Sequence, residues 1–529
     1  MTLAAQTSER KSSHWLLAGA VAGLVMTACM FVLRVVFGAQ TLPELVQDQL
    51  IALVPGSVFG FVIDRLQFVA KPMLLVGLAL LGVPFGALVG WLYGRLHRRR
   101  GRWELLGGAA CGIVVWLAFE LAVVALGDGV SAAVATGGWL LLSAEVYGIA
   151  LVLLVRLIEV PMEQAAPVDR QRRLIVFSGL GGSALLVAGG ALARMLATNV
   201  EQQAAPEPTE AQAATAPTTH PPSAAPPEPA IIPKGVADEV TPNERFYIVS
   251  KNFNDPRVSA DKWSLEVLGL VAQPRRFSYE EILAMPTVSQ YTTLECISNT
   301  LGGNLMSNAH WTGVPLSELV SGLGAQPEAQ AIIFRSADNY YESFPLDVAL
   351  APGVLLAHTM NGVPLPDKHG FPLRLILPGR YGVKSPKWIT RIEFYQAAEP
   401  IAGYWVRRGW DAEALVQTVA RIDTPQNNAN LTGSHLQVGG VAFAGSRGIA
   451  RVEASVDGGR TWREAGTRPP LGSSTWGQWG LTWHDLSPGT HEVLARATDG
   501  TGALQTSEEN GSFPAGATGY HRARVNIVG

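Results

Sequence analysis

One cysteine in this sequence stands where it could do chemistry. Cys296 follows the β-branched and apolar run that begins at Tyr291 and precedes a polar turn, so we expect its sulfur at the end of a strand. A lone cysteine is most often a small buried hydrophobe. Two active roles are also open: a thiolate nucleophile beside a base, or a soft ligand for a metal that a cofactor also holds. His310 and His358 are available as bases, but neither lies in a catalytic motif.

A second candidate site is a strand whose flanking turns carry cations. Residues 361–388 place His369, Arg374, Lys384 and Lys387 beside turns that contain glycine and proline. Guanidinium groups and the N–H groups of such turns bind phosphates, so the segment suits an anionic ligand. A solvated basic loop has the same composition, and composition alone favours that interpretation.

Four motifs follow one another through the second half of the sequence. They are Leu294-Glu-Cys-Ile-Ser-Asn299, Trp311-Thr-Gly-Val-Pro-Leu316, Asn361-Gly-Val-Pro-Leu-Pro-Asp-Lys-His-Gly-Phe-Pro-Leu-Arg374 and Lys387-Trp388. In this order they resemble the molybdopterin-binding domain of the sulfite oxidase family. The resemblance covers about residues 240–529, and its C-terminal part resembles the family's immunoglobulin-like dimerisation domain. Independently, the short alternating strands there and the Asp457-Gly-Gly turn are typical of a β-sandwich.

The resemblance implies a molybdenum cofactor. Cys296 would supply the thiolate ligand of molybdenum, and the pterin dithiolene would supply the remaining sulfur ligands. Tyr340 matches the family's active-site tyrosine, with the adjacent Tyr341 leaving one residue of ambiguity, and Lys251 lies in the anion pocket. The positions that match the family's cofactor-binding residues, or lie in the same loops, are Asn252, Asp338, His369, Arg374, Lys384, Ser385 and Lys387.

The substrate pocket departs from the family pattern. Thr300 and Leu301 stand where sulfite oxidases carry arginines, and Lys251 replaces another arginine. A doubly charged oxyanion needs bidentate donors, which a lysine does not supply. The resemblance implies oxygen-atom transfer to or from a small sulfur compound. A sulfoxide reductase of the same fold stays open as an alternative, and so does a cofactor-free, membrane-tethered binding module.

The first 198 residues contain the long apolar runs that predict a membrane domain. Five runs approach the about 20 residues that cross a bilayer, namely 15–37, 73–94, 105–126, 134–155 and 174–196. A shorter run near 44–63 contains Pro55 and suits a re-entrant segment. With five spanning helices, the basic clusters at Arg10, Arg98 and Arg172 all face the cytoplasm, as the positive-inside rule requires. We therefore expect the later residues on the periplasmic or extracellular side.

Several residues of this membrane domain bear on electron transfer and export. Glu120 and Glu145 lie inside predicted spans, where a carboxylate has a functional or a hydrogen-bonded structural role. Arg172-Arg173 resembles an internal twin-arginine export signal, or simply marks the cytoplasmic side. The spans lack a central histidine and the sequence lacks a Cys-x-x-Cys-His motif, so we expect no haem in this chain. Electrons must then enter or leave through a separate carrier, a cytochrome or a quinone-linked protein, or directly through the membrane.

Composition agrees with a membrane-anchored globular protein. Hydrophobic residues make up 48% and charged residues 16% of the sequence, and the mean hydropathy is +0.20, which excludes a purely soluble or a disordered chain. A net charge of −3 gives no reason to expect a nucleic-acid partner. Three cysteines, two of them in apolar runs, exclude a disulfide framework and a multi-cysteine zinc site.

These observations predict a multi-domain architecture. We expect an α-helical membrane bundle that contacts lipid over 1–198, a Pro/Ala-rich linker over 199–230, an α+β molybdopterin domain over 231–400 and an immunoglobulin-like β-sandwich over 401–529, through which the chain could form a homodimer. Within the α+β domain, residues 263–271, 330–337 and 372–379 predict strands, and residues 278–286 and 315–323 predict short helices.

Overall fold

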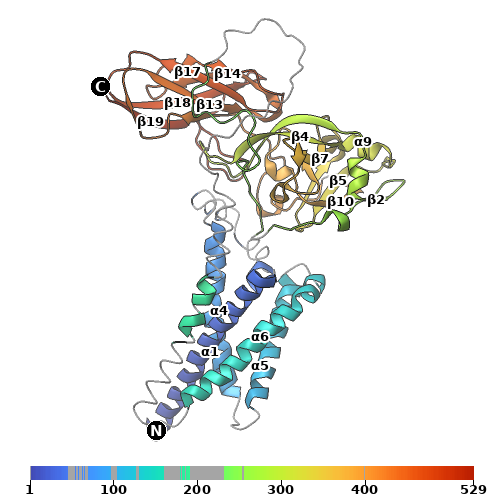
Figure 1. Ribbon diagram of the computed structural model, residues 1–529, viewed down its shortest axis with the longest axis vertical. Helices are drawn as coiled ribbons and strands as arrows, with labels where there is room; N and C mark the ends of the chain where they lie inside the picture. Colours follow the sequence, from blue (N-terminus) through green and yellow to red (C-terminus); the bar gives the residue numbers. More distant parts are fainter. Residues whose placement is uncertain are drawn as a thin grey trace. The chain divides into compact units, whose positions relative to one another are not determined.

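The computed structural model describes the chain in two compact units, one helical and one rich in strands (Figure 1). The described residues are 2–37, 39–45, 70–96, 104–126, 130–159, 231–252, 255–397 and 400–528, with isolated positions between 54 and 65 and between 179 and 190. The predicted re-entrant segment and fifth span lie mostly outside these residues. The linker over 199–230 and Arg172-Arg173 lie entirely outside them.

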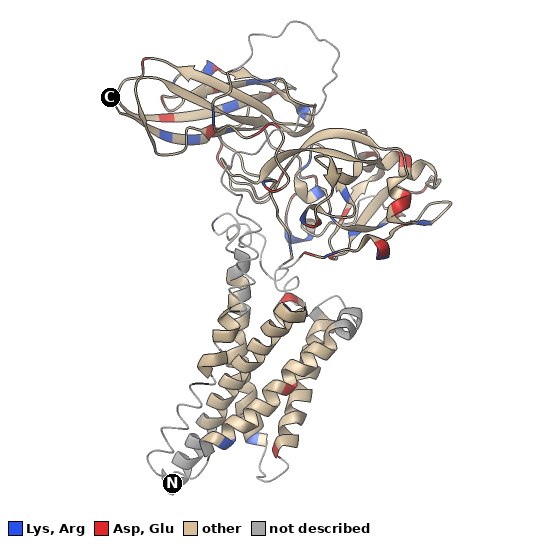
Figure 2. Cartoon of the chain, in the orientation of Figure 1, with Lys and Arg blue, Asp and Glu red and all other residues tan. Residues whose placement is uncertain are grey.

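The helical unit contains four long helices among its described residues. They are α1 (Thr2–Phe37), α4 (Ala70–Leu96), α5 (Glu104–Leu126) and α6 (Val130–Glu159). The segments long and apolar enough to cross a membrane are His14–Phe37, Ala79–Leu96, Glu104–Ala125 and Thr136–Leu157. They coincide with the first four predicted spans, and Figure 2 shows few charged residues along these helices.

Small residues let these helices pack closely. α1 packs against α4 and α6, and α5 packs against α6. A Cβ atom on Gly23 of α1 would lie 2.3 Å from the carbonyl oxygen of Gly82 on α4, so only glycine fits there. The hydroxyl of Tyr147 on α6 donates a hydrogen bond to the carbonyl oxygen of Gly86 on α4, at 2.7 Å. Glu120 accepts a hydrogen bond from the indole of Trp116 at 2.9 Å, which gives this carboxylate a structural contact.

The β-rich unit begins with two sheets that share a core. One has the order β2-β1-β10-β5-β6, and the other has the order β3-β4-β7-β8 with β9 paired to β7. Leu265, Ile332 and Ile392 from the first sheet pack with Leu356 and Leu375 from the second, all at 0% exposure. The strands are β1 (Leu265–Gly269), β2 (Arg275–Phe277), β3 (Val288–Glu295), β4 (Met306–Pro315), β5 (Ala331–Ser336), β6 (Tyr341–Pro345), β7 (Leu355–Met360), β8 (Val363–Pro364), β9 (Arg374–Ile376) and β10 (Ile389–Tyr395).

Short helices connect these strands where the sequence predicts them. α8 (Tyr279–Leu283) starts with a capping box in which Ser278 and Glu281 bond each other's backbone N–H groups, and α9 (Leu316–Ser321) follows β4 directly. The others are α10 (Leu346–Ala349) and the 3₁₀ turns η2 (Ala260–Lys262), η3 (Asp367–His369), η4 (Gly382–Lys384), η5 (Val406–Arg408) and η6 (Gly445–Arg447).

The remaining strands form a β-sandwich. Its two sheets have the orders β11-β13-β17-β16 and β12-β19-β18-β14-β15, and their inner faces bury Trp479, Val452 and Val525 together. Gly458 and Gly459 have positive φ angles at the turn between β14 and β15, as the Asp457-Gly-Gly motif predicts. The strands are β11 (Val419–Thr424), β12 (Ala429–Thr432), β13 (Leu436–Phe443), β14 (Ile449–Ser455), β15 (Arg463–Glu464), β16 (Gly466–Thr467), β17 (Gly477–Trp483), β18 (Gly489–Asp499) and β19 (His521–Val528).

Candidate active site

Cys296 lies directly after β3, at the strand end that the sequence predicts. The residue is 8% exposed, its backbone N–H donates to the carbonyl oxygen of Leu305 at 2.9 Å, and its Sγ lies 3.1 Å from Oγ of Ser298. Burial raises the pKa of the Cys296 thiol, so this sulfur needs a cation or a metal beside it to be a thiolate.

The two histidines considered as bases for Cys296 make other contacts. The ring of His310 packs against Tyr291 at 4.7 Å, and Nδ1 of His358 lies 2.9 Å from Oγ1 of Thr359. Among the described residues, neither histidine is hydrogen-bonded to Cys296. These contacts do not support His310 or His358 as the base of a cysteine nucleophile.

A loop from Ser298 to Leu305 follows Cys296 and is held from both sides. The side chain of Asn299 accepts from the backbone N–H of Leu305 and donates to the carboxylate of Glu295 at 2.9 Å. From the β-sandwich, Arg421 on β11 donates to the carbonyl oxygen of Gly303 at 3.2 Å. Thr300 and Leu301, at the positions where the family resemblance implies arginines, lie in this loop.

Arg374 is the buried centre of the cationic segment. It begins β9, is 5% exposed, and donates to the carbonyl oxygens of His369 and Ser385 at 3.0 and 3.4 Å. Its guanidinium carbon lies 5.0 Å from the ring centre of Trp311. Its buried Nε makes no hydrogen bond within the part of the chain that the structure describes. Burial lowers the pKa of Arg374 to about 10, which marks a cation without a full counter-charge.

His369 and Lys387 stand beside Arg374 because two turns are tied together. Gly370, with a φ of +115°, ends η3, and a Cβ atom there would press on Lys387 and Arg374. Burial lowers the pKa of Lys387 to about 8 and that of His369 to about 3, so the histidine is neutral at neutral pH. Nε2 of His369 lies 3.0 Å from the carbonyl oxygen of Asn243 and must donate to it, which leaves Nδ1 as an acceptor.

The predicted residues Asn252, Asp338 and Tyr340 form a connected group. The side-chain amide of Asn252 donates to Asp338 at 2.9 Å, and the backbone N–H of Tyr340 donates to the same carboxylate at 3.1 Å. The charge of Asp338 also acts on Lys387, which connects this group to the cationic segment.

The structure distinguishes the two adjacent tyrosines. The side chain of Tyr340 points into the protein at 9% exposure, where its ring lies 5.5 Å from that of Tyr404. Tyr341 is only partly buried and packs against Arg335 and Arg407. Lys251 is 9% exposed, with its ammonium 5.1 Å from the ring centre of Tyr404. Tyr340 is thus the tyrosine that shares a neighbourhood with Lys251.

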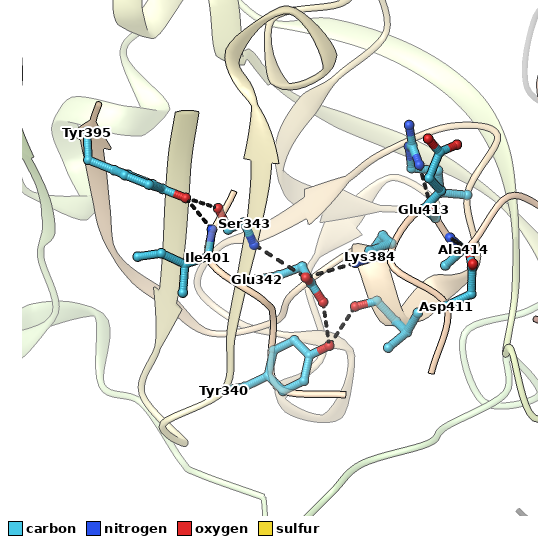
Figure 3. Close-up of polar contacts among 11 residues, drawn as sticks. Tyr340, Glu342, Ser343, Lys384, Tyr395, Ile401, Asp411, Glu413 and Ala414 are labelled. Atoms are coloured by element: carbon cyan, nitrogen blue, oxygen red, sulfur yellow. Dashed lines mark hydrogen bonds and ion pairs between the residues drawn. The ribbon is translucent and has the colours of Figure 1, made fainter. Parts of the chain in front are cut away.

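Lys384 and Ser385 use their side chains inside the protein. The ammonium of Lys384 pairs with Glu342 at 2.9 Å, and the hydroxyl of Ser385 accepts from the backbone N–H of Leu377 at 3.2 Å. Figure 3 shows Glu342 between Lys384 and Tyr340. The assignment of Lys384 and Ser385 to the cofactor stays a prediction.

Sequence reasoning missed two residues of this region, Tyr247 and Glu342. The phenol of Tyr247 lies within electrostatic range of both Cys296 and Arg374, and burial together with Cys296 raises its pKa. The signal that could have found Tyr247 is its place in the same segment as Lys251. Glu342 gave no local signal, because its ionic partner lies 42 residues further along the chain.

The residues brought together here fit a molybdenum cofactor. Cys296 supplies a soft sulfur at a strand end, and a pterin dithiolene would complete a sulfur-rich ligand set. The buried Nε of Arg374 and the ammonium of Lys387 are donors suited to the phosphate of such a cofactor. The neutral His369 adds an acceptor at Nδ1.

Comparison with known proteins places the chain in a family. Residues 252–405 match the model of the oxidoreductase molybdopterin binding domain, and residues 419–495 match that of a bacterial Ig domain. The uncharacterized oxidoreductase YuiH of Bacillus subtilis is 36% identical over 149 residues, which is 28% of this chain and 72% of that protein. The chain belongs to the sulfite oxidase family.

Two sulfite oxidases are similar over a longer stretch. The mitochondrial sulfite oxidase of Drosophila melanogaster is 28% identical over 342 residues, which is 54% of this chain and 59% of that enzyme. The sulfite oxidase of Arabidopsis thaliana is 27% identical over 331 residues, which is 51% of this chain and 83% of that enzyme. The chain therefore spans about three fifths of the Drosophila relative. The chain carries a molybdopterin-binding domain of the sulfite oxidase family followed by a C-terminal Ig-like region, as the sequence motifs predict.

Proposed function

We propose that this chain is a membrane-anchored enzyme that transfers an oxygen atom to or from a small sulfur compound, neutral or singly charged. Its β-rich unit would lie on the periplasmic or extracellular side. The observation that carries this proposal is the grouping of a buried cysteine, a desolvated cationic segment and a buried tyrosine in one family fold. When bound, the cofactor supplies a two-electron redox centre.

The residues of this chain would bind and orient the reactants. Arg374, Lys387 and His369 would hold the pterin and its phosphate, and Asn252 and Asp338 would fix the neighbouring edge of the pocket. The ring of Tyr340, whose hydroxyl donates to the carbonyl oxygen of Val383, would form part of the wall of the substrate pocket. Electrons would pass to or from a separate carrier, and the carrier's potential would set the direction, so sulfoxide reduction is the second candidate function.

The choice of substrate rests on the positions at which the family resemblance implies arginines. Thr300 and Leu301 offer no guanidinium group, and Lys251 is a point charge without the planar fork of an arginine. With these three residues, the pocket would bind a doubly charged oxyanion more weakly than a pocket with arginines at the same positions. We therefore expect poor turnover of sulfite and better turnover of a neutral sulfoxide or a monoanionic sulfur compound.

Steady-state kinetics with artificial redox partners test this proposal. Lys251→Met should raise the KM for an anionic substrate with little effect on a neutral sulfoxide, whereas Thr300→Arg should improve sulfite turnover. Efficient sulfite oxidation by the unmodified protein, unaffected by either substitution, would show that other groups hold the anion.

The oligomeric state has its own test. A homodimer formed through residues 401–529 is expected from the family resemblance, and light scattering of the purified full chain in detergent would detect it. A monomer at micromolar concentration would contradict it.

A further inference from the structure

An ion pair is buried beside the proposed active-site tyrosine. The ammonium of Lys384 lies 2.9 Å from Oε1 of Glu342, and the two side chains are 2% and 1% exposed. Removing two charges from water costs free energy that their attraction only partly offsets, so such a pair is weak evidence for stability. A role in positioning a neighbour would explain it.

The neighbour is Tyr340. Its hydroxyl donates to the carbonyl oxygen of Val383 at 2.7 Å and lies 3.4 Å from Oε2 of Glu342 (Figure 3). Oε1 of Glu342 is already engaged by Lys384 and by the backbone N–H of Ser343 at 3.3 Å. The carboxylate is thereby oriented with its second oxygen toward the phenol.

We propose that the Glu342–Lys384 pair is a positioning device that keeps Tyr340 protonated and its hydroxyl held on the carbonyl oxygen of Val383, so that the ring is fixed beside the substrate pocket. The inference rests on the proposed function only in making Tyr340 the residue that faces the substrate. Glu342 and Lys384 are positioning residues, because they act through Tyr340.

The surrounding charges are consistent with this role. Burial and the carboxylates of Glu342 and Asp338 raise the pKa of Tyr340. Tyr404 packs against Tyr340, and the cations Lys251 and Arg408 lie over the ring of Tyr404, at 5.1 and 3.7 Å from its centre. Of these charged groups, Glu342 lies within hydrogen-bond distance of the Tyr340 hydroxyl, so its charge should have the largest effect on the ionisation of the phenol.

Opposite substitutions in the pair provide the test. Glu342→Gln removes the negative charge and leaves the ammonium, so it should lower the ionisation midpoint of Tyr340 by at least about one pH unit. Lys384→Met removes the positive charge and should not lower that midpoint. The double variant removes both charges, so its Tyr340 midpoint should lie between those of the two single variants. It also keeps the test usable if a single variant with an unpaired buried charge does not fold.

The midpoint is measured in the full chain by ultraviolet difference spectra at alkaline pH, each protein against the same protein carrying Tyr340→Phe. The alkaline limb of the kcat profile should move in the same direction. Tyr395→Phe is the control, because Tyr395 bonds Ser343 on the same strand without carrying a charge near Tyr340. An unchanged Tyr340 midpoint in Glu342→Gln, or an equal decrease in both single variants, would overturn the proposal.

Molybdenum content separates this inference from the proposed function. Failure of the unmodified chain to bind molybdenum would remove the proposed function but leave the spectroscopic titration interpretable. A normal molybdenum content with no shift in the titration would remove the inference alone.

Discussion

Desolvated cations are concentrated around Arg374. Burial lowers the pKa of Arg374 to about 10 and that of Lys387 to about 8, since each ammonium or guanidinium group has lost water without gaining a full counter-charge. An anionic ligand would supply that charge and restore both pKa values. At the scale of single residues, the side chains of this segment are therefore suited to bind a phosphate.

Cys296 gives the first prediction at this scale. Substitution of a residue that only supports a metal ligand typically lowers metal affinity or activity 10- to 100-fold. Cys296 is the proposed molybdenum ligand itself, so its substitution should lower activity further. We expect Cys296→Ser to lower turnover by more than about 100-fold with the fold retained by circular dichroism. Cys111→Ser, in helix α5, is the control and should keep its activity. Full activity in Cys296→Ser with molybdenum retained would contradict the assignment.

His369 gives a prediction about acid stability. Its pKa is lowered to about 3 in the folded protein, against about 6.5 in an unfolded chain, so between these values only the unfolded state takes up the proton. Stability must then fall as the pH falls through this window, by about 2 kcal/mol between pH 7 and pH 5. Urea unfolding followed by tryptophan fluorescence should show a smaller loss in His369→Asn. Equal losses in the two proteins would contradict the argument.

At the scale of elements, the segment from Ile401 to Tyr404 is fitted against β6. Its backbone N–H at Ile401 donates to the hydroxyl of Tyr395, which also bonds Ser343 on β6 (Figure 3). Further along, Gly403 lies so close to β6 that a Cβ atom would stand 1.9 Å from Oε1 of Glu342. This contact positions Tyr404 beside Tyr340.

Substitution of Gly403 tests that fit. Gly403→Ala should destabilise the protein by about 1–3 kcal/mol, because the added methyl group overlaps a buried carboxylate that is already paired. Gly322→Ala is the matched control, since a Cβ atom there meets nothing within 4 Å and φ is negative. Thermal unfolding of the two variants should differ, and equal midpoints would show that the segment moves aside freely.

The strands that the sequence predicts correctly are those that local residue patterns define. The β-branched run before Cys296 is β3, and the runs at 263–271, 330–337 and 372–379 contain β1, β5 and β9. Glu342 could not be predicted, because a glutamate in a short strand normally faces solvent and its partner comes from a distant turn. The choice between Tyr340 and Tyr341 also needed the tertiary structure.

At the scale of the β-rich unit, the β-sandwich supports the loop that follows Cys296. A Cβ atom on Gly302, whose φ is +72°, would lie 2.1 Å from Nε2 of His521 on β19. Nδ1 of His521 accepts from the backbone N–H of Ile422, which fixes the ring in place. The loop and the sandwich thus fit together without room for a side chain.

Gly302→Ala should therefore destabilise the protein by more than the strain of a positive φ angle alone. Gly362 also has a positive φ, of +80°, but a Cβ atom there meets nothing within 4 Å. We expect Gly302→Ala to lower the unfolding free energy by about 1–3 kcal/mol more than Gly362→Ala does. Chemical denaturation of both variants measures the difference, and its absence would mean that the loop can shift away from His521.

The orientation of the whole chain is a further prediction. A cysteine introduced at Ser223 in the linker should react with a membrane-impermeant maleimide added to intact cells or spheroplasts. A cysteine introduced at Gly101, beside the basic cluster, should react only after lysis. The reverse pattern would place the β-rich unit in the cytoplasm.

The contact between Gly302 and His521 also orders events in time. His521 is synthesised about 220 residues after Cys296, a delay of roughly 10 to 45 seconds at ordinary translation rates. Until β19 has joined its sheet, the loop beside the cysteine lacks one of its walls. The final packing of the loop beside Cys296 is consequently a late step of folding, which follows synthesis of the sandwich.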